Sequence, residues 1–96
     1  MNYLDVDGDL IRSCLPEGTG VPEDSKDLFA LYAVLMRVKG AATQAADVHD
    51  AWSAWMARTD PEHESIRPFD QLSPAVQAED LPFLNAIHRA ANIREH

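Results

Sequence analysis

The sequence has little of what marks secreted, membrane-spanning or nucleic-acid-binding proteins. Its 96 residues include a single cysteine, Cys14, so no internal disulfide can form and we expect an intracellular, cytoplasmic protein. No apolar run approaches the roughly 20 residues of a transmembrane helix, and the first residues lack the basic region and apolar run of a signal peptide. Basic residues are also few, 8 against 16 acidic ones, for a net charge of −8. A field of this sign disfavours nucleic acid and anionic membranes as partners.

The spacings of common catalytic and metal sites are also missing. Asp5, Asp7 and Asp9 begin like a calcium-binding loop, but such a loop needs Gly and Glu at later positions where this chain has Leu10 and Pro16. No His-x-x-x-His or Cys-x-x-Cys pair indicates zinc, and no nucleophile elbow or glycine-rich phosphate loop is present. We therefore expect no catalytic residue, no metal and no cofactor, and a protein that is not an enzyme.

What the chain does have is many alanine and leucine residues. Apolar residues make up 46% of it, and β-branched residues are sparse, which favours helix over strand. Its length indicates one domain, residues 1–96. We predict an all-α (mainly α) fold, a small single-domain bundle of four to five short helices with an irregular loop at 59–72.

Capping residues and apolar spacing predict where these helices lie and which faces they bury. The predicted helices are a first one within 2–15, then 26–39, 44–58, 74–78 and a last one after residue 80. The predicted N-caps are Ser25, Thr43, Ser73 and Asp80, and Gly40 is the predicted stop of the second helix. The predicted buried faces are Tyr3, Val6, Leu10 and Cys14; Leu28, Leu31, Tyr32, Leu35 and Val38 with Phe29, Ala33 and Met36; Val48, Trp52, Trp55 and Met56; and Leu84, Ile87, His88 and Ala91.

Polar and aromatic residues are densest at the end of the third predicted helix and in the loop after it. Trp52 and Trp55 either pack in the core, as aromatic residues at helical spacing usually do, or form a stacking wall for a flat group. Arg67 either pairs with a nearby carboxylate or offers its guanidinium to a ligand phosphate. The candidate ligand-binding residues are His49, Trp52, Trp55, His63, Arg67 and Phe69.

The residues of this region also follow a recognisable order. The order is Ala46-x-x-His49-x-x-Trp52, then His63-x-x-Ile66-x-Pro68-Phe69-x-x-Leu72, then a short acidic helix and Asp80. Over residues 46–93 it resembles the ryanodine-receptor (RyR) repeat domain, which also occurs in bacteria and their viruses. The Gly-Trp-x-Tyr-Gly segment of that family is missing before His63, and Glu64 stands where the family usually has Pro. The whole chain also resembles short uncharacterised proteins of actinobacteria and their phages.

The resemblance implies a helical module that binds a nucleotide-derived small molecule. Such a module would sense a signal or, if phage-encoded, sequester it in the host cytoplasm. On this hypothesis Trp55 or Phe69 stacks on the base, His49 and His63 hydrogen-bond to the ligand, and Arg67 meets a phosphate.

An alternative is an accessory protein of a phage or bacterium that binds a host protein through an acidic helical surface. Exposed Tyr3, Phe29 or Trp55 would then serve as anchors, and the same kind of surface would suit a homodimer. A small enzyme or structural protein with no inferable activity is the third interpretation.

Overall fold

Five α-helices make up most of the computed structural model, which describes residues 2–95 and contains no strand among them. The α-helices are α1 (Tyr3–Ser13), α2 (Lys26–Lys39), α3 (Ala45–Met56), α4 (Pro74–Ala78) and α5 (Leu81–Glu95), with 3-10 turns η1 (Gly40–Ala42) and η2 (Phe69–Gln71). The predicted all-α fold is confirmed, and 59–72 is irregular apart from η2. The radius of gyration is 12.8 Å, close to the ~12.5 Å expected of a compact domain of this length.

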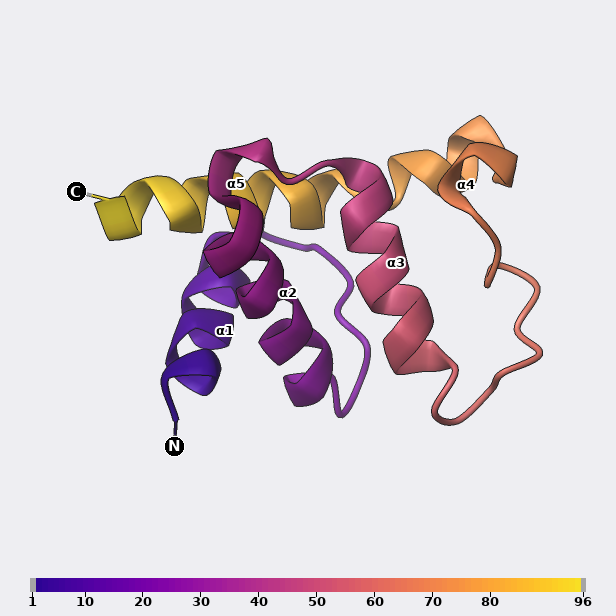
Figure 1. Cartoon of the computed structure of the whole chain (residues 1–96), viewed down its shortest axis with the longest axis horizontal. Coiled ribbons are helices and arrows are strands. Elements are labelled where there is room, and N and C mark those ends of the chain that lie inside the picture. The colour runs from indigo at the N-terminus through magenta and orange to yellow at the C-terminus, as the bar shows by residue number, and fades with distance from the viewer. Residues whose placement is uncertain (1, 96) are drawn as a thin grey trace.

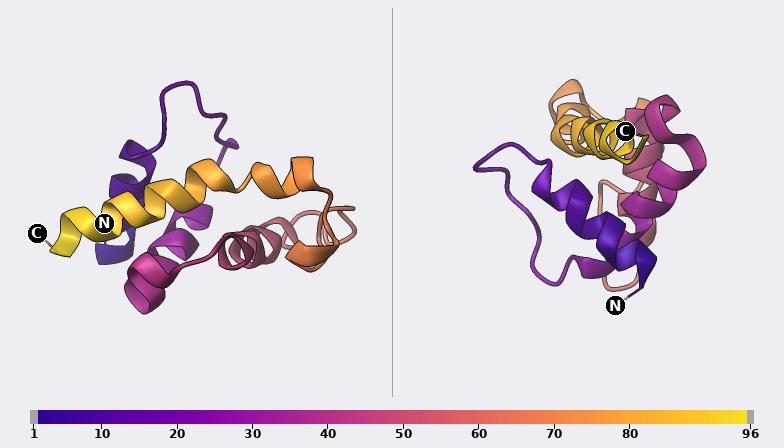
Figure 2. Two further views of the ribbon diagram at one scale, coloured as in Figure 1. Left: turned by 90° about the horizontal axis from the view of Figure 1, so that it is seen from above. Right: turned by 90° about the vertical axis from the view of Figure 1, so that its left-hand side faces the viewer.

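The longest helix, α5, runs across the other three long helices and contacts each of them (Figure 1; Figure 2). α1 and α2 pack against each other under one half of α5, and α3 lies under the other half. Helix α4 and the irregular segment 57–73 lie at the end of the molecule farthest from α1 (Figure 1). The core between these helices consists of Ile11, Leu28, Phe29, Tyr32, Ala33, Met36, Val48, Ala86, Ile87, Ala90 and Ala91. None of the helices in residues 2–95 is long and apolar enough to cross a membrane.

The α1–α2 contact depends on a glycine. A Cβ atom at Gly8 would lie 3.2 Å from the backbone carbon and oxygen of Phe29 and 3.3 Å from its Cβ. Real side chains are rarely held so close to backbone, so the small residue is what lets the two helices approach. Gly8 is therefore a packing residue, although in sequence it only weakens the helix.

The predicted buried face of α1 is wrong in its first half. Tyr3 and Val6 are 61% and 54% exposed, whereas Asp7, Gly8 and Ile11 are buried. The helix turns its glycine toward α2, and Asp7 is held in this partly apolar interface by ion pairs with Arg37 and Arg94. Leu10 and Cys14, the other half of the predicted face, do pack against the core.

The other predicted faces are largely confirmed. In α2, Phe29, Ala33 and Met36 are all buried, as are Leu28 and Tyr32. Val38, which was also predicted to be buried, is 75% exposed. In α3, Val48 is buried while Trp52, Trp55 and Met56 are half-buried. In α5 the small residues Ala86 and Ala90 are buried more fully than the predicted Leu84 and His88, because alanines let α5 lie close to the helices beneath it.

Two of the predicted helix ends are confirmed in detail. Gly40 ends α2 with φ of 53°, a left-handed conformation that glycine adopts without strain. Ser73 caps α4, where its Oγ accepts a hydrogen bond from the backbone N–H of Val76, and Pro74 occupies the first helical position.

Of the predicted N-caps Thr43 and Ser25, one is wrong and the other is confirmed in position only. Thr43 does not cap α3, because its hydroxyl donates to the carbonyl of Gly40 (2.8 Å) and closes η1. Gln44 takes the N-cap position, and its backbone N–H donates to the carboxylate of Asp47. Ser25 does precede α2, but it makes no capping hydrogen bond.

Candidate functional site

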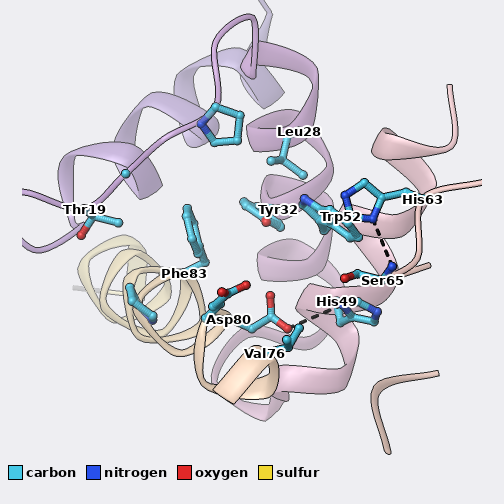
Figure 3. A pocket seen from close by; sticks show the side chains of 14 residues that line it. Thr19, Leu28, Tyr32, His49, Trp52, His63, Ser65, Val76, Asp80 and Phe83 are labelled. Atoms are coloured by element: carbon cyan, nitrogen blue, oxygen red, sulfur yellow. Dashed lines mark hydrogen bonds and ion pairs between the residues drawn. The ribbon is translucent and has the colours of Figure 1, made fainter. Parts of the chain in front are cut away.

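A cavity of about 540 Å³ opens where α3, the start of α5 and the loop before α2 meet (Figure 3). This volume lies within the range of roughly 300–1,000 Å³ that is typical of small-molecule sites. The cavity is lined by residues from five parts of the chain: Thr19, Gly20 and Pro22 of the loop, Leu28 and Tyr32 of α2, His49 and Trp52 of α3, His63 and Ser65 of the irregular segment, and Val76, Glu79, Asp80, Pro82 and Phe83 around α4 and α5. None of these residues is a lysine or an arginine.

Local sequence explains how the helices present these side chains. His49 and Trp52 are three residues apart on α3, and Leu28 and Tyr32 are four apart on α2, so each pair shares one helix face. Asp80 lies in the short break between α4 and α5, which points its side chain across the break toward α3 (Figure 3). The walls therefore come from segments far apart in the sequence.

Aromatic rings form the two sides of the cavity. Trp52 is held between two histidines: its ring stacks on His49 at a centroid distance of 5.6 Å, and His63 meets it edge-on at 5.2 Å. Across the cavity, Phe83 packs against Tyr32 with centroids 5.8 Å apart. Figure 3 shows Phe83 on one side of the opening and Trp52 with His63 on the other.

His49 is the buried polar residue of the site, only 3% exposed. Its Nε2 donates to the backbone carbonyl of Arg67 (2.9 Å) and also lies 3.3 Å from the hydroxyl of Ser53. The carbonyl can only accept, so the hydrogen is on Nε2. The other ring nitrogen, Nδ1, faces the carboxyl of Asp80 at 3.7 Å.

His63 is oriented by its own loop. The backbone N–H of Ser65 donates to its Nδ1 (3.1 Å), so this nitrogen is unprotonated and the ring is a neutral Nε2–H tautomer. The ring orientation against Trp52 is therefore fixed by a local turn rather than by a distant partner.

Two titratable groups that line the cavity, Asp80 and Tyr32, have pKa values raised mainly by burial. Burial raises the pKa of the Asp80 carboxyl to about 6, while the charge of His49 acts to lower it and that of Glu79 to raise it. Oδ2 of Asp80 is buried and has no hydrogen-bond partner among residues 2–95. Burial, assisted by the charge of Asp80, also raises the pKa of the Tyr32 hydroxyl, which stays protonated at neutral pH.

Three of the six predicted binding residues, His49, Trp52 and His63, meet at this cavity. Trp55 packs half-buried against the core, and Phe69 lies behind His49 with centroids 6.2 Å apart. Neither ring lines the cavity, whereas Trp52 does.

Arg67 also lies outside the cavity. Its exposed guanidinium donates through Nε to the carbonyl of Glu64 (3.0 Å) and lines a smaller hollow of about 230 Å³. The two hollows share Ser65 and Val76 as wall residues. It is the backbone of Arg67, not its charge, that contacts His49.

Sequence reasoning missed Phe83, Glu79 and the loop residues of the wall, and it assigned Asp80 only to helix capping. The carboxyl of Asp80 accepts no hydrogen bond from the backbone of α5 in the described structure, and it faces His49 instead. An aspartate directly before a helix looks the same in sequence whether its carboxylate caps that helix or faces a residue of another helix. Only the tertiary structure distinguishes the two cases.

A metal site finds no candidate ligand set here. Within residues 2–95 no three His, Cys, Asp or Glu side chains are grouped closely enough to hold an ion. One ring nitrogen of His49 and one of His63 are hydrogen-bonded to backbone groups instead.

The fold and the cavity define a small all-α domain with an aromatic-walled pocket. The chain belongs to the family described as Domain of unknown function (DUF7701), which matches residues 2–92. Neither the curated proteins nor the solved structures contain a match to the chain. The family match covers nearly the whole chain and carries no link to the ryanodine-receptor repeat, whose resemblance rests on motifs within 46–93.

Proposed function

We propose that this domain is a non-enzymatic binding module whose cavity holds a small molecule with a flat, nucleobase-like ring. The observation that carries the proposal is the pair of aromatic walls, with Trp52 on one side and Phe83 on the other (Figure 3). Flat ligands gain free energy by stacking on such rings, and every base offers a face to stack. A few polar groups at one edge, chiefly Asp80 and Glu79, would fix the orientation.

Trp52 is well suited to stacking because its ring is already ordered. His49 and His63 contact it from two directions, and both histidines are themselves held by backbone hydrogen bonds. A preorganised wall loses little conformational entropy when a ligand arrives. The two histidines thus support the site by holding Trp52, in addition to any contact with the ligand.

The cavity favours the base over the phosphate of a nucleotide-derived molecule. Two carboxylates and no lysine or arginine line it, and the whole chain carries a charge of −8. A phosphate would therefore lie outside the cavity, where Arg67 in the adjoining hollow is the available cation. Sensing or sequestering a nucleotide-derived signal, in a bacterium or by a phage-encoded protein, is the biological role that such binding would serve.

Calorimetry and thermal shift with adenosine, guanosine, cyclic mononucleotides and cyclic ADP-ribose test the proposal. Base–aromatic stacking is worth about 1–3 kcal/mol per base, so Trp52→Leu should weaken binding roughly tenfold or more. Trp55→Leu is the matched control, since Trp55 is on the same helix but does not line the cavity, and circular dichroism should show both variants folded. Absence of heat and of any thermal shift across the panel with the unmodified protein would rule the proposal out.

A protein partner is the second candidate function. Tyr3 and Val6, three residues apart on α1, are both mostly exposed, whereas Phe29 is buried and cannot act as an anchor. Two apolar side chains on one exposed helix face suit a partner helix or a second copy of the chain. Sedimentation equilibrium of the protein and of Val6→Asp tests self-association, which the substitution should abolish.

A further inference from the structure

The cavity contains a carboxyl group whose hydrogen-bonding capacity is unused. A carboxylate can accept about four hydrogen bonds, yet Asp80 accepts none from residues 2–95 within hydrogen-bonding distance. Nδ1 of His49 lies 3.7 Å from Oδ2, which is too far for a hydrogen bond. Buried polar groups in native proteins are nearly always paired, so an exception of this kind calls for an explanation.

His49 cannot turn to satisfy Asp80 in full. Its Nε2 is committed to the carbonyl of Arg67 at 2.9 Å, so Nδ1 is the one nitrogen left to face the carboxyl. At 3.7 Å, Nδ1 and Oδ2 are beyond hydrogen-bonding distance. His49 therefore faces Oδ2 without bonding to it, and the second oxygen of Asp80 also accepts no hydrogen bond from residues 2–95.

The free part of the Asp80 side chain faces the cavity. The side chain retains 14% exposure although Oδ2 itself is buried, so its remaining exposure lies away from His49. Figure 3 shows the carboxyl between the His49 ring and the open centre of the cavity. The neighbouring Glu79 adds a second acidic side chain to this wall, and no lysine or arginine lines the cavity.

We infer that the cavity selects flat ligands whose edge presents N–H donors to Asp80, such as an aminopurine-type base or an aryl amidinium. This inference rests on the proposed function and narrows it to a ligand class. Donor hydrogens aimed at a carboxylate form charge-assisted hydrogen bonds, which are stronger than neutral ones. An anionic edge would instead meet Asp80 and Glu79 as like charges and be rejected.

Stacking and the donor edge fit together in the observed geometry. Trp52 and Asp80 both line the cavity. His49 lies next to each of them: it stacks on Trp52, and its Nδ1 lies 3.7 Å from Oδ2 of Asp80. The aromatic walls also favour a cationic ring over a neutral one, through the interaction of a cation with π-electrons. The same pocket thus recognises the face and the edge of its ligand with different residues.

Calorimetry with matched probes at pH 7.5 tests the inference. Benzamidine, benzamide and benzoate share one flat shape but present an amidinium, a neutral amide and a carboxylate. Guanosine and 1-methylguanosine differ by a single ring N–H, and caffeine is flat with no N–H donor at all. We expect benzamidine to bind at least tenfold more tightly than benzoate, and guanosine at least tenfold more tightly than caffeine. Comparing guanosine with benzamidine then tells whether a base or a simple amidinium is the better source of the donor edge.

The variant Asp80→Asn should abolish these preferences. Asp70→Asn, an exposed carboxylate outside the cavity, is the control and should keep them. If caffeine and benzoate bind as tightly as the donor-bearing probes, the inference is overturned while the proposed function stands. If no flat probe binds at all, the proposed function and the inference both fail.

Discussion

Replacing Asp80 by asparagine should stabilise the unliganded protein at neutral pH but not at low pH. Burial raises the pKa of this carboxyl from 3.8 to about 6, so the folded state holds the proton more tightly than the unfolded state does. The stability that this proton contributes is present below the unfolded value of 3.8 and is lost as the pH rises through about 6. Above that pH the ionised carboxylate destabilises the fold, and Asp80→Asn removes this penalty.

The size of the effect follows from the shift. Each pKa unit corresponds to about 1.4 kcal/mol of differential stabilisation, which would make two units worth about 3 kcal/mol. Solvent at the cavity mouth screens the group, so we expect an actual change of about 1–2 kcal/mol. This cost in the free protein is the free energy that a donor-bearing ligand would recover.

Urea unfolding followed by far-UV circular dichroism, at five pH values from 4 to 8, measures this difference. The free energy of unfolding of Asp80→Asn minus that of the unmodified protein should increase by about 1–2 kcal/mol between pH 4 and pH 7 and then level off. Asp50→Asn, an exposed carboxylate on α3, is the control and should change the free energy by less than about 0.5 kcal/mol. A difference that does not vary with pH, or a variant that is less stable at pH 7, would refute the reasoning.

Three further predictions concern the fold. Gly8→Ala should lower the free energy of unfolding by about 1–2 kcal/mol in urea titrations, because overpacking against Phe29 outweighs the better helix propensity of alanine. Gly20→Ala is the control: Gly20 has open space around it, so this substitution should be neutral. Equal effects of the two substitutions would contradict the packing role of Gly8. Ser73→Ala should cost about 1 kcal/mol through loss of the α4 cap, and an unchanged urea midpoint would show that the cap is dispensable. Hydrogen bonds from the backbone of Gln44 and from Lys39 hold the pKa of Asp47 below its usual value. Asp47→Asn should therefore destabilise the protein at pH 7, and this loss of stability should disappear as the pH falls below the usual pKa range of aspartate. A loss of stability that persists in acid would contradict this prediction.

The sequence predicted the helices well because their signals are local. Gly40 and Ser73 act within one turn of the helices they end or begin, and the spacing of Phe29, Ala33 and Met36 reports a face directly. The buried face of α1 was mispredicted because Gly8 has no side chain and so does not count as an apolar position. Gly8 is buried because α1 lies close to α2, and this contact cannot be read from the sequence of α1.

The cavity was predictable only in part, for the same reason. His49, Trp52 and His63 stand out by residue type, and the structure brings them together. Phe83 and the loop residues line the opposite side of the cavity (Figure 3), and nothing near them in the sequence indicates a wall. Asp80 was assigned to a helix start, but its carboxyl faces His49 instead, and that contact depends on where α3 lies.

Whether the cavity between Trp52 and Phe83 binds a ligand can be seen in a ¹H–¹⁵N NMR titration with guanosine. Chemical-shift changes should concentrate on the Trp52 indole N–H and on the backbone amides around His63, Asp80 and Phe83, and caffeine at the same concentration should produce smaller changes. Spectra that stay unchanged, or changes centred on the exposed face of α1, would contradict a ligand site in the cavity.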